Sequence, residues 1–196
     1  MTTAYNKFYI NGEWVEPAGR ETIDVINPAT EEAFATISMG TAEDVDAAAK
    51  AARAAFPSWS QSSVEERKTV LQKIMAGIQA RAGDLAAAIT SEMGAPVGLA
   101  NAAQVPSGLG HFAAVLPVLE NYKFQETRGS TLIVKEAAGV CGFITPWNWP
   151  LNQIACKVAP ALAAGCTIVL KPSEVAPINA YILAEIIDEC GLPPGV

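Results

Sequence analysis

Two groups of side chains that could do chemistry each follow an apolar segment of the sequence. The first group comes directly after the segment that ends at Ile144 and consists of Thr145, Pro146, Trp147 and Asn148. The second group comes directly after the segment that ends at Leu170 and consists of Lys171, Ser173 and Glu174. Ligands of open parallel sheets bind beyond the carboxyl ends of the strands. If the two segments are neighbouring parallel strands, the two groups lie side by side.

The chemistry of these side chains suits a dinucleotide. Lys171 offers a positive charge and three donors, and the Glu174 carboxylate can accept hydrogen bonds from both ribose hydroxyls of an adenosine. An acidic residue facing the ribose favours NAD over NADP, because it repels a 2′-phosphate. Asn148 offers an amide donor just before a predicted helix N-terminus, and such a donor can stabilise an oxyanion.

Structural roles would also account for these residues. On spacing alone, Lys171 and Glu174 are better interpreted as a solvated ion pair before a helix. Residues 147–150 are equally well interpreted as an apolar turn with an asparagine near a helix cap. The Gly-x-Gly-x-x-Gly fingerprint of dinucleotide-binding domains is absent. The residues alone therefore indicate a parallel α/β domain with a candidate nucleotide site.

The elements that must position these groups can be predicted from the pattern of apolar residues and from the Pro and Gly residues that begin and end helices. Residues 139–144 form an expected buried strand, and a helix follows from Pro150 to about Ala164, with Gly165 placed to end it. Residues 166–170 form a continuous apolar strand, as expected in a parallel sheet that is covered on both faces. Residues 177–190 form a further helix, closed by Gly191. This βαβ crossover predicts a doubly wound parallel sheet.

Helices and short strands are expected before this unit. Asn11-Gly12 predicts a hairpin turn within residues 8–15, and residues 22–26 form an extended segment. Capping boxes begin at Thr41 and Ser63 and predict two helices, and a third covers residues 84–93. Further segments complete the set: a helix over 100–119 that Pro106 and Pro117 must kink or break, and a strand over 131–136.

Composition limits the class of protein. The 196 residues are 51% hydrophobic and carry a formal net charge of −7 with scattered basic residues. No clustered positive patch is present, so neither nucleic acid nor an anionic membrane is the expected partner. No stretch of 18 or more uninterrupted apolar residues occurs, and no transmembrane helix is expected. The N-terminus lacks the layout of a signal peptide, so we expect a soluble, cytoplasmic protein.

The cysteines are interpreted as packing residues. Four are present, without Cys-x-x-Cys spacing, and only one histidine could join them in a metal site. We therefore expect neither a metal site nor disulfides. The four positions are Cys141, Cys156, Cys166 and Cys190. The end of the sequence, residues 191–196, has the composition of a loop that leads into another strand. A two-stranded parallel sheet is too small for a finished domain, so we expect this sequence to be a truncated part of a longer protein.

Three blocks of the sequence resemble the aldehyde dehydrogenase superfamily. They are residues 142–150, 157–167 and 171–177, and they occur in the order and at the spacing typical of that family. Looser matches at residues 10–14, 27–30 and 56–59 extend the resemblance over essentially the whole chain. The resemblance implies an α/β fold: part of a Rossmann-like doubly wound sheet, with N-terminal helices and a β-arm. It implies that residues 1–196 are an incomplete NAD(P)-binding domain, with 122–136 as an oligomerisation arm.

The resemblance also implies roles for individual residues. Ile144, Thr145, Pro146 and Trp147 would line the cofactor site, and Asn148 would be the oxyanion-hole asparagine. Lys171 and Glu174 would hold the adenosine ribose of NAD, with Ser173 close by. The implied reaction is the oxidation of a small aldehyde to a carboxylic acid through a cysteine thioester, in a homodimer or homotetramer. The nucleophilic cysteine, the general-base glutamate and the Gly-rich segment of the family would lie beyond residue 196.

Other outcomes remain open from the sequence. The parent enzyme could be a semialdehyde dehydrogenase that uses NADP, or an acylating form that passes the acyl group to coenzyme A. Glu174 argues against strict use of NADP. The 196-residue chain by itself could be a non-catalytic module for cofactor binding or oligomerisation. The aldehyde cannot be named, although Gly110, His111 and Phe112 could face the substrate tunnel of the family.

Overall fold

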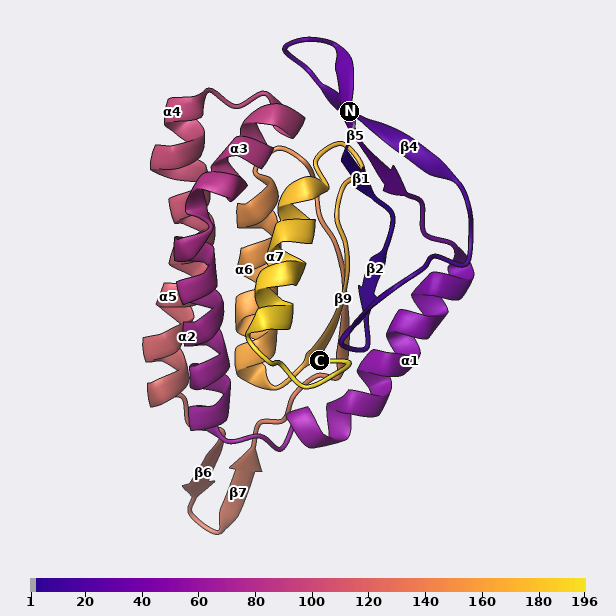
Figure 1. Cartoon of the computed structure of the whole chain (residues 1–196). Helices are drawn as coiled ribbons and strands as arrows, with labels where there is room; N and C mark the ends of the chain where they lie inside the picture. Colours follow the sequence, from indigo (N-terminus) through magenta and orange to yellow (C-terminus); the bar gives the residue numbers. More distant parts are fainter. Residues whose placement is uncertain (1–2) are drawn as a thin grey trace.

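A pair of parallel strands joined by a crossover helix lies at the centre of the structure, a computed structural model that describes residues 3–196. Strand β8 (Val140–Ile144) pairs with β9 (Thr167–Lys171), and Ile144 lies opposite Lys171. Helix α6 (Pro150–Ala164) connects the two strands. Figure 1 shows α6 and α7 (Ile178–Glu189) on one side of β9 and α1 (Ala42–Trp59) on the other. The predicted βαβ unit is therefore confirmed.

The two central strands are less buried than the sequence predicted. Both begin one residue later than expected, and the Ile144 side chain is 81% exposed. Most residues of β8 and β9 are at best half-buried. Within residues 3–196, β8 and β9 form a two-stranded sheet, so their outer edges face no further strand.

All three helices predicted within residues 41–93 are present. Besides α1, these are α2 (Val64–Ala80) and α3 (Ala82–Met93). The Thr41 side chain accepts a hydrogen bond from the Asp44 backbone N–H, and the Asp44 carboxylate accepts one from the Thr41 backbone N–H, so the capping box is complete. Ser63 and Glu66 form the same arrangement at the start of α2. Both predicted helix starts are thereby confirmed.

The long helical segment stops at neither Pro106 nor Pro117. It runs through α4 (Val97–Leu99), a π-helical stretch η1 (Ala100–Gln104) and α5 (Val105–Asn121). The Val105 N–H donates to the Ala100 carbonyl, five residues back, so the wider turn ends just before Pro106. A π-bulge changes which carbonyl faces the proline ring, which explains why the expected break is absent there.

The segment Val97–Asn121 is also long and apolar enough to cross a membrane by length and composition. Its most apolar stretch is only 28% buried within the described residues. Phe112 and Gly108 of this helix nevertheless pack inside the protein, as expected for a core helix, and length with composition is a weak criterion. The expectation of no membrane partner stays a prediction.

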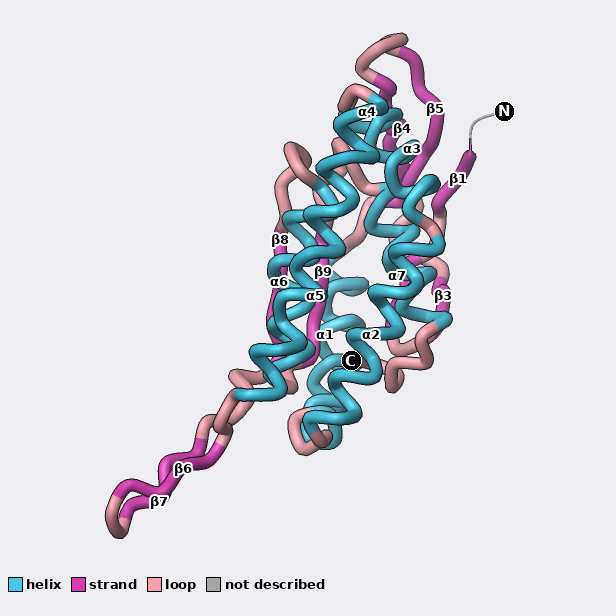
Figure 2. The backbone as a smooth tube through the Cα atoms, turned by 90° about the vertical axis from the view of Figure 1, so that its left-hand side faces the viewer, coloured by secondary structure: helices cyan, strands magenta, loops and turns pink. Residues whose placement is uncertain are grey.

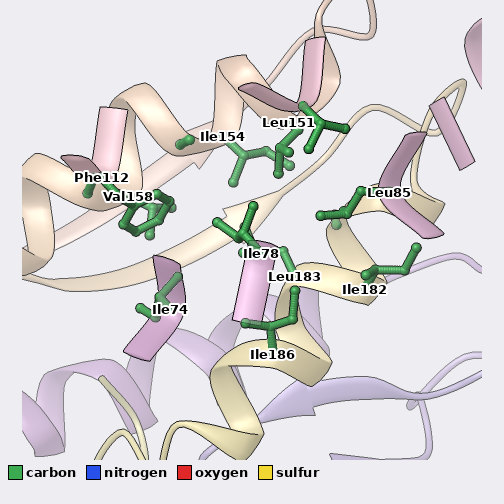
Figure 3. Packing of buried hydrophobic residues seen from close by; sticks show 14 of the residues in the cluster. Ile74, Ile78, Leu85, Phe112, Leu151, Ile154, Val158, Ile182, Leu183 and Ile186 are labelled. Atoms are coloured by element: carbon green, nitrogen blue, oxygen red, sulfur yellow. The ribbon is translucent and has the colours of Figure 1, made fainter. Parts of the chain in front are cut away.

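One hydrophobic core joins the helices (Figure 3). Ile78 of α2 lies between Leu183 and Ile186 of α7 and the side chains of α5 and α6, and Ile74 belongs to the same cluster (Figure 3). Both isoleucines are fully buried. These residues belong to the buried apolar face of α2. On α1, Ala52 is buried whereas Val45 is exposed.

The contact between α5 and α6 depends on Gly108. A methyl group at this position would meet Leu151 Cγ at 2.6 Å and Cδ2 at 2.8 Å. We expect Gly108→Ala to lower the free energy of unfolding by roughly 1 to 3 kcal/mol in a denaturant titration, because Leu151 is fully buried and cannot move aside. Gly110→Ala is the matched control on the same helix, since nothing lies within 4 Å of its added methyl group. Equal destabilisation of both variants would contradict this account of the helix contact.

The N-terminal strands only partly follow the prediction. The hairpin of β2 (Phe8–Ile10) and β3 (Glu13–Val15) turns at Asn11 and Gly12, with φ of 56° and 78°. Both angles are positive, as a tight hairpin turn requires. A separate sheet has the order β1-β5-β4, and the sequence indicated β4 alone. Its strands are β1 (Thr3–Tyr5), β4 (Thr22–Asn27) and β5 (Glu32–Ser38).

A second hairpin projects beyond the end of α5 (Figure 2). Strands β6 (Gln125–Arg128) and β7 (Thr131–Val134) pair with each other and extend away from the rest of the chain (Figure 2). The side chains of Leu132 and Val134 are exposed on this hairpin. The shape matches the β-arm expected over residues 122–136.

Candidate functional site

The two loops that carry the candidate residues lie side by side, as predicted. They follow the carboxyl ends of β8 and β9, which are neighbours in the parallel pair. The Thr145 backbone N–H donates to the Lys171 carbonyl at 3.2 Å, so the pairing continues one residue past the end of β8. Thr145 is buried by this contact. The fold therefore brings the first group of residues to the second.

The first loop presents its side chains to solvent. Ile144, Pro146, Trp147 and Asn148 are all exposed. Helix α6 begins at Pro150, two residues after Asn148. Its N-cap residue, Trp149, provides no side-chain cap. The partial positive charge of an uncapped helix N-terminus therefore lies close to the Asn148 amide. Both features favour a negatively charged oxygen at this position.

The second loop carries an ion pair. Lys171 Nζ lies 2.6 Å from Glu174 Oε2, and both side chains are about half exposed. The hydrogen bond from Lys171 lowers the pKa of the Glu174 carboxyl below its usual value. The solvated ion pair that the sequence allowed as an alternative is thus present. The ion pair engages only Oε2 of the carboxylate, so it does not by itself exclude a ribose contact at the other oxygen.

Ser173 shapes this loop from within. Its hydroxyl accepts a hydrogen bond from the Val175 N–H at 3.3 Å, and its carbonyl accepts one from the Ala176 N–H at 3.2 Å. These bonds fold residues 173–176 into a tight turn before α7. Ser173 is half-buried and lies between the two charged residues in the sequence.

An apolar groove of about 380 Å³ adjoins the second loop. It lies between β9, α1, α7 and the β2–β3 hairpin, and its lining includes Ile168, Leu170, Ala184 and the exposed Val45. The Ile168 N–H donates to the Val196 carbonyl at 2.9 Å, so Val196 lies along the outer edge of β9.

A buried carboxylate lies near the second loop, and the sequence analysis did not identify it. Glu92 of α3 is 1% exposed and accepts hydrogen bonds from the Ile178 and Asn179 N–H groups at the start of α7, at 2.5 and 3.1 Å. Burial raises its pKa to about 7, although these donors act in the opposite direction. Glu92 lies seven residues after the fully buried Leu85, so helical periodicity could have placed it on the buried face.

The residues considered for a substrate tunnel divide into different roles. Phe112 is fully buried in the core, so its expected position at a tunnel is wrong. His111 is half-buried, and its Nε2 lies 3.0 Å from Asn152 Nδ2 on the first turn of α6. Gly110 is exposed.

The cysteines give no sign of activation. All four are free thiols, with Cys166 and Cys190 buried and the other two half-buried. Burial raises the pKa of both the Cys141 and Cys190 thiols, which disfavours the nucleophilic thiolate. Within residues 3–196, no group of three or more metal-ligating side chains is gathered.

A parallel βαβ unit, with a Trp-Asn loop after one strand and a Lys-Glu pair after the next, defines a nucleotide-binding type of α/β domain. The family model described as "Aldehyde dehydrogenase family" matches residues 14–196. The chain belongs to the aldehyde dehydrogenase family. A 3-succinoylsemialdehyde-pyridine dehydrogenase from Pseudomonas sp is 56% identical over 193 residues, which are 98% of this chain and 40% of that protein. The chain thus spans about two fifths of the length of the relatives it matches.

Solved structures agree closely with this fold. Aldehyde dehydrogenase C from Pseudomonas syringae, crystallised as a mutant with NAD+ and octanal, gives a TM-score of 0.96 at 50% identity, over 97% of this chain and 39% of that one. An aldehyde dehydrogenase from Bartonella henselae also gives 0.96, at 45% identity, over 99% and 42% of the two chains. A betaine aldehyde dehydrogenase from Staphylococcus aureus with NAD+ gives 0.92 at 38% identity, over 97% and 40%. Family and fold are therefore established over essentially the whole chain.

Proposed function

We propose that the full-length protein oxidises a small aldehyde to a carboxylic acid with NAD as the hydride acceptor. The observation that carries this proposal is the contact between the Asn148 loop and the Lys171–Glu174 loop at the carboxyl ends of β8 and β9. Membership of the family and the NAD+ complexes of two similar proteins support it. When bound, NAD accepts the hydride that leaves the substrate carbon.

The residues of this chain bind and orient. Glu174 accepts hydrogen bonds from the adenosine ribose, and Lys171 holds the Glu174 carboxylate and adds a positive charge beside the ribose. Residues 144–147 form one wall for the cofactor, where the exposed Ile144 and Trp147 supply apolar surface. Asn148 donates its amide to the substrate carbonyl oxygen, which gains negative charge during nucleophilic attack. We propose that the nucleophile comes from residues outside this chain.

The preference for NAD over NADP can be tested at Glu174. In the full-length protein, we expect Glu174→Gln to raise the Kd for NAD about tenfold, because a charge-assisted hydrogen bond becomes a neutral one. The effect on NADP is smaller, since repulsion of the 2′-phosphate is removed at the same time. Calorimetric titration with both nucleotides measures the two changes. Glu189→Gln, an exposed acidic residue at the end of α7, is the control. Unchanged selectivity in Glu174→Gln would remove this residue from the ribose site.

The β6–β7 hairpin supports a proposal about assembly. We propose that it is an oligomerisation arm and that the full-length protein is a homodimer or homotetramer. The hairpin projects beyond the end of α5 (Figure 2) and exposes Leu132 and Val134, which a partner subunit would cover. Sedimentation of a Leu132→Asp variant tests this, and an unchanged oligomeric state would contradict it. The cytoplasmic location expected from the sequence stays a prediction.

A further inference from the structure

Glu92 joins two parts of the chain that are far apart in sequence. Besides the two backbone N–H groups at the start of α7, its carboxylate accepts a hydrogen bond from the Asn179 side chain at 2.6 Å. The same Asn179 amide donates to the Ala176 carbonyl at 2.9 Å. Both Glu92 and Asn179 are buried. The end of α3 is thereby fastened to the first turn of α7.

The fastened turn continues directly into the Lys171–Glu174 loop. Ala176 is buried, and its N–H donates to the Ser173 carbonyl. An unbroken series of hydrogen bonds thus leads from Glu92, through Asn179 and Ala176, to Ser173. On the other side, the Thr145 bond to Lys171 fixes the start of the loop. Glu92 therefore fixes its far end.

A buried carboxylate is a costly means of capping a helix. None of the hydrogen bonds to Glu92 within residues 3–196 comes from a lysine or arginine, so the positive end of α7 and neutral donors must offset the loss of hydration. A buried ionisable group is weak support for stability, and a shorter neutral cap would be cheaper. A role in placing the loop accounts for the carboxylate better than a role in stability.

We propose that Glu92 is a positioning residue for the cofactor loop: it holds the start of α7 so that Glu174 and Lys171 face the ribose of NAD. This inference rests on the proposed function, because it assigns the loop to the cofactor. Glu92 itself touches no substrate or cofactor. Without the Glu92 carboxylate, the loop keeps the same residues but can adopt more than one arrangement.

The first test compares Glu92→Gln with the wild type in the full-length protein. Glutamine fills the same space, but its amide NH2 opposes one of the N–H donors of α7. We expect the KM for NAD to rise about tenfold with kcat at saturating NAD nearly unchanged. A variant that only unfolds more readily would instead lose active enzyme and kcat, with KM unchanged. Asp84→Asn, an exposed acidic residue on the same helix, is the matched control. Unchanged KM would overturn the proposal.

A second readout does not depend on activity. Hydrogen–deuterium exchange of peptides that contain Ile178 and Asn179 should speed up about tenfold in Glu92→Gln, because their N–H groups lose an acceptor. Unchanged exchange would overturn the anchoring itself. If the wild type fails to use NAD, or if Glu174→Gln leaves NAD affinity unaltered, the proposed function fails first, and the exchange result still decides whether Glu92 holds α7.

A pH profile separates positioning from simple packing. Burial raises the pKa of Glu92 to about 7. Below this pH the carboxyl carries a proton that points at N–H donors of α7, so one of its hydrogen bonds to the helix is lost. We expect the KM for NAD to rise as the pH falls from about 8 to 6 in the wild type and to stay level in Glu92→Gln. Among facing groups, burial raises the pKa of Tyr5, with Glu185 and Glu92 adding to the effect, so this phenol is neutral throughout. Arg81 and Glu185 near it pair with each other at 2.5 Å. Parallel profiles in both proteins would contradict the role of Glu92.

Discussion

Replacing Asn148 with alanine in the full-length protein is expected to lower aldehyde turnover about a hundredfold or more. The expected loss corresponds to one oxyanion donor, roughly 3 to 4 kcal/mol of transition-state stabilisation. The reason lies in the geometry of the loop: Asn148 is exposed directly before the uncapped N-terminus of α6, where a developing negative charge is favoured. Steady-state kinetics at saturating NAD measures kcat.

The comparison of kcat with cofactor affinity makes this prediction specific. Because Asn148 would act on the substrate oxygen, the Kd for NAD should change little in the same variant. Asn121→Ala is a control at the far end of α5, where the side chain only bonds the Pro117 carbonyl of its own helix. Normal turnover in Asn148→Ala, or a loss that appears only in NAD affinity, would assign this residue a purely structural role.

Phe112→Ala is expected to lower the free energy of unfolding by about 3 to 5 kcal/mol. Phe112 is the largest fully buried side chain of the core, and it packs beside Val158 of α6 (Figure 3). Truncation removes buried apolar surface and leaves a cavity that two packed helices cannot close. Denaturant titration measures the loss, with the slope of the transition as a check on two-state behaviour.

A conservative variant and a surface variant bound this expectation. Phe112→Leu fills most of the cavity and should lose less than half as much stability. Val118→Ala, on the same helix but 58% exposed, should change the free energy of unfolding by no more than about 0.5 kcal/mol. If Phe112→Ala were as mild as Val118→Ala, the α5–α6 contact would not be part of the cooperative core.

Local signals in the sequence were sufficient wherever a short segment decides its own conformation. Asn11 and Gly12 adopt the positive φ angles of a hairpin turn. Thr41 and Ser63 begin helices because their hydroxyls satisfy backbone N–H groups three residues ahead. Gly165 ends α6 with φ of 87°, a conformation that glycine adopts without strain. Each of these predictions depends on atoms within one turn of the chain.

Predictions that depended on distant partners were less successful. Strand β1 pairs in parallel with β5, and β5 itself was not predicted, because pairing between segments some 30 residues apart leaves no local pattern. The buried faces of β8 and β9 were expected from composition, but burial depends on neighbouring strands, and within residues 3–196 these two strands have only each other. The π-helical stretch before Pro106 likewise reflects how the helix accommodates a proline ring.

The candidate site combines both kinds of information. The sequence by itself determined which residues follow the ends of two parallel strands, and hence that Asn148 and Lys171 belong to neighbouring loops. Only the tertiary structure decided that Lys171 pairs with Glu174, and that Glu92 fastens the helix after this loop. The physical reason is that strand direction and helix capping are set by local backbone geometry, whereas hydrogen bonds of buried side chains depend on which distant segments pack together.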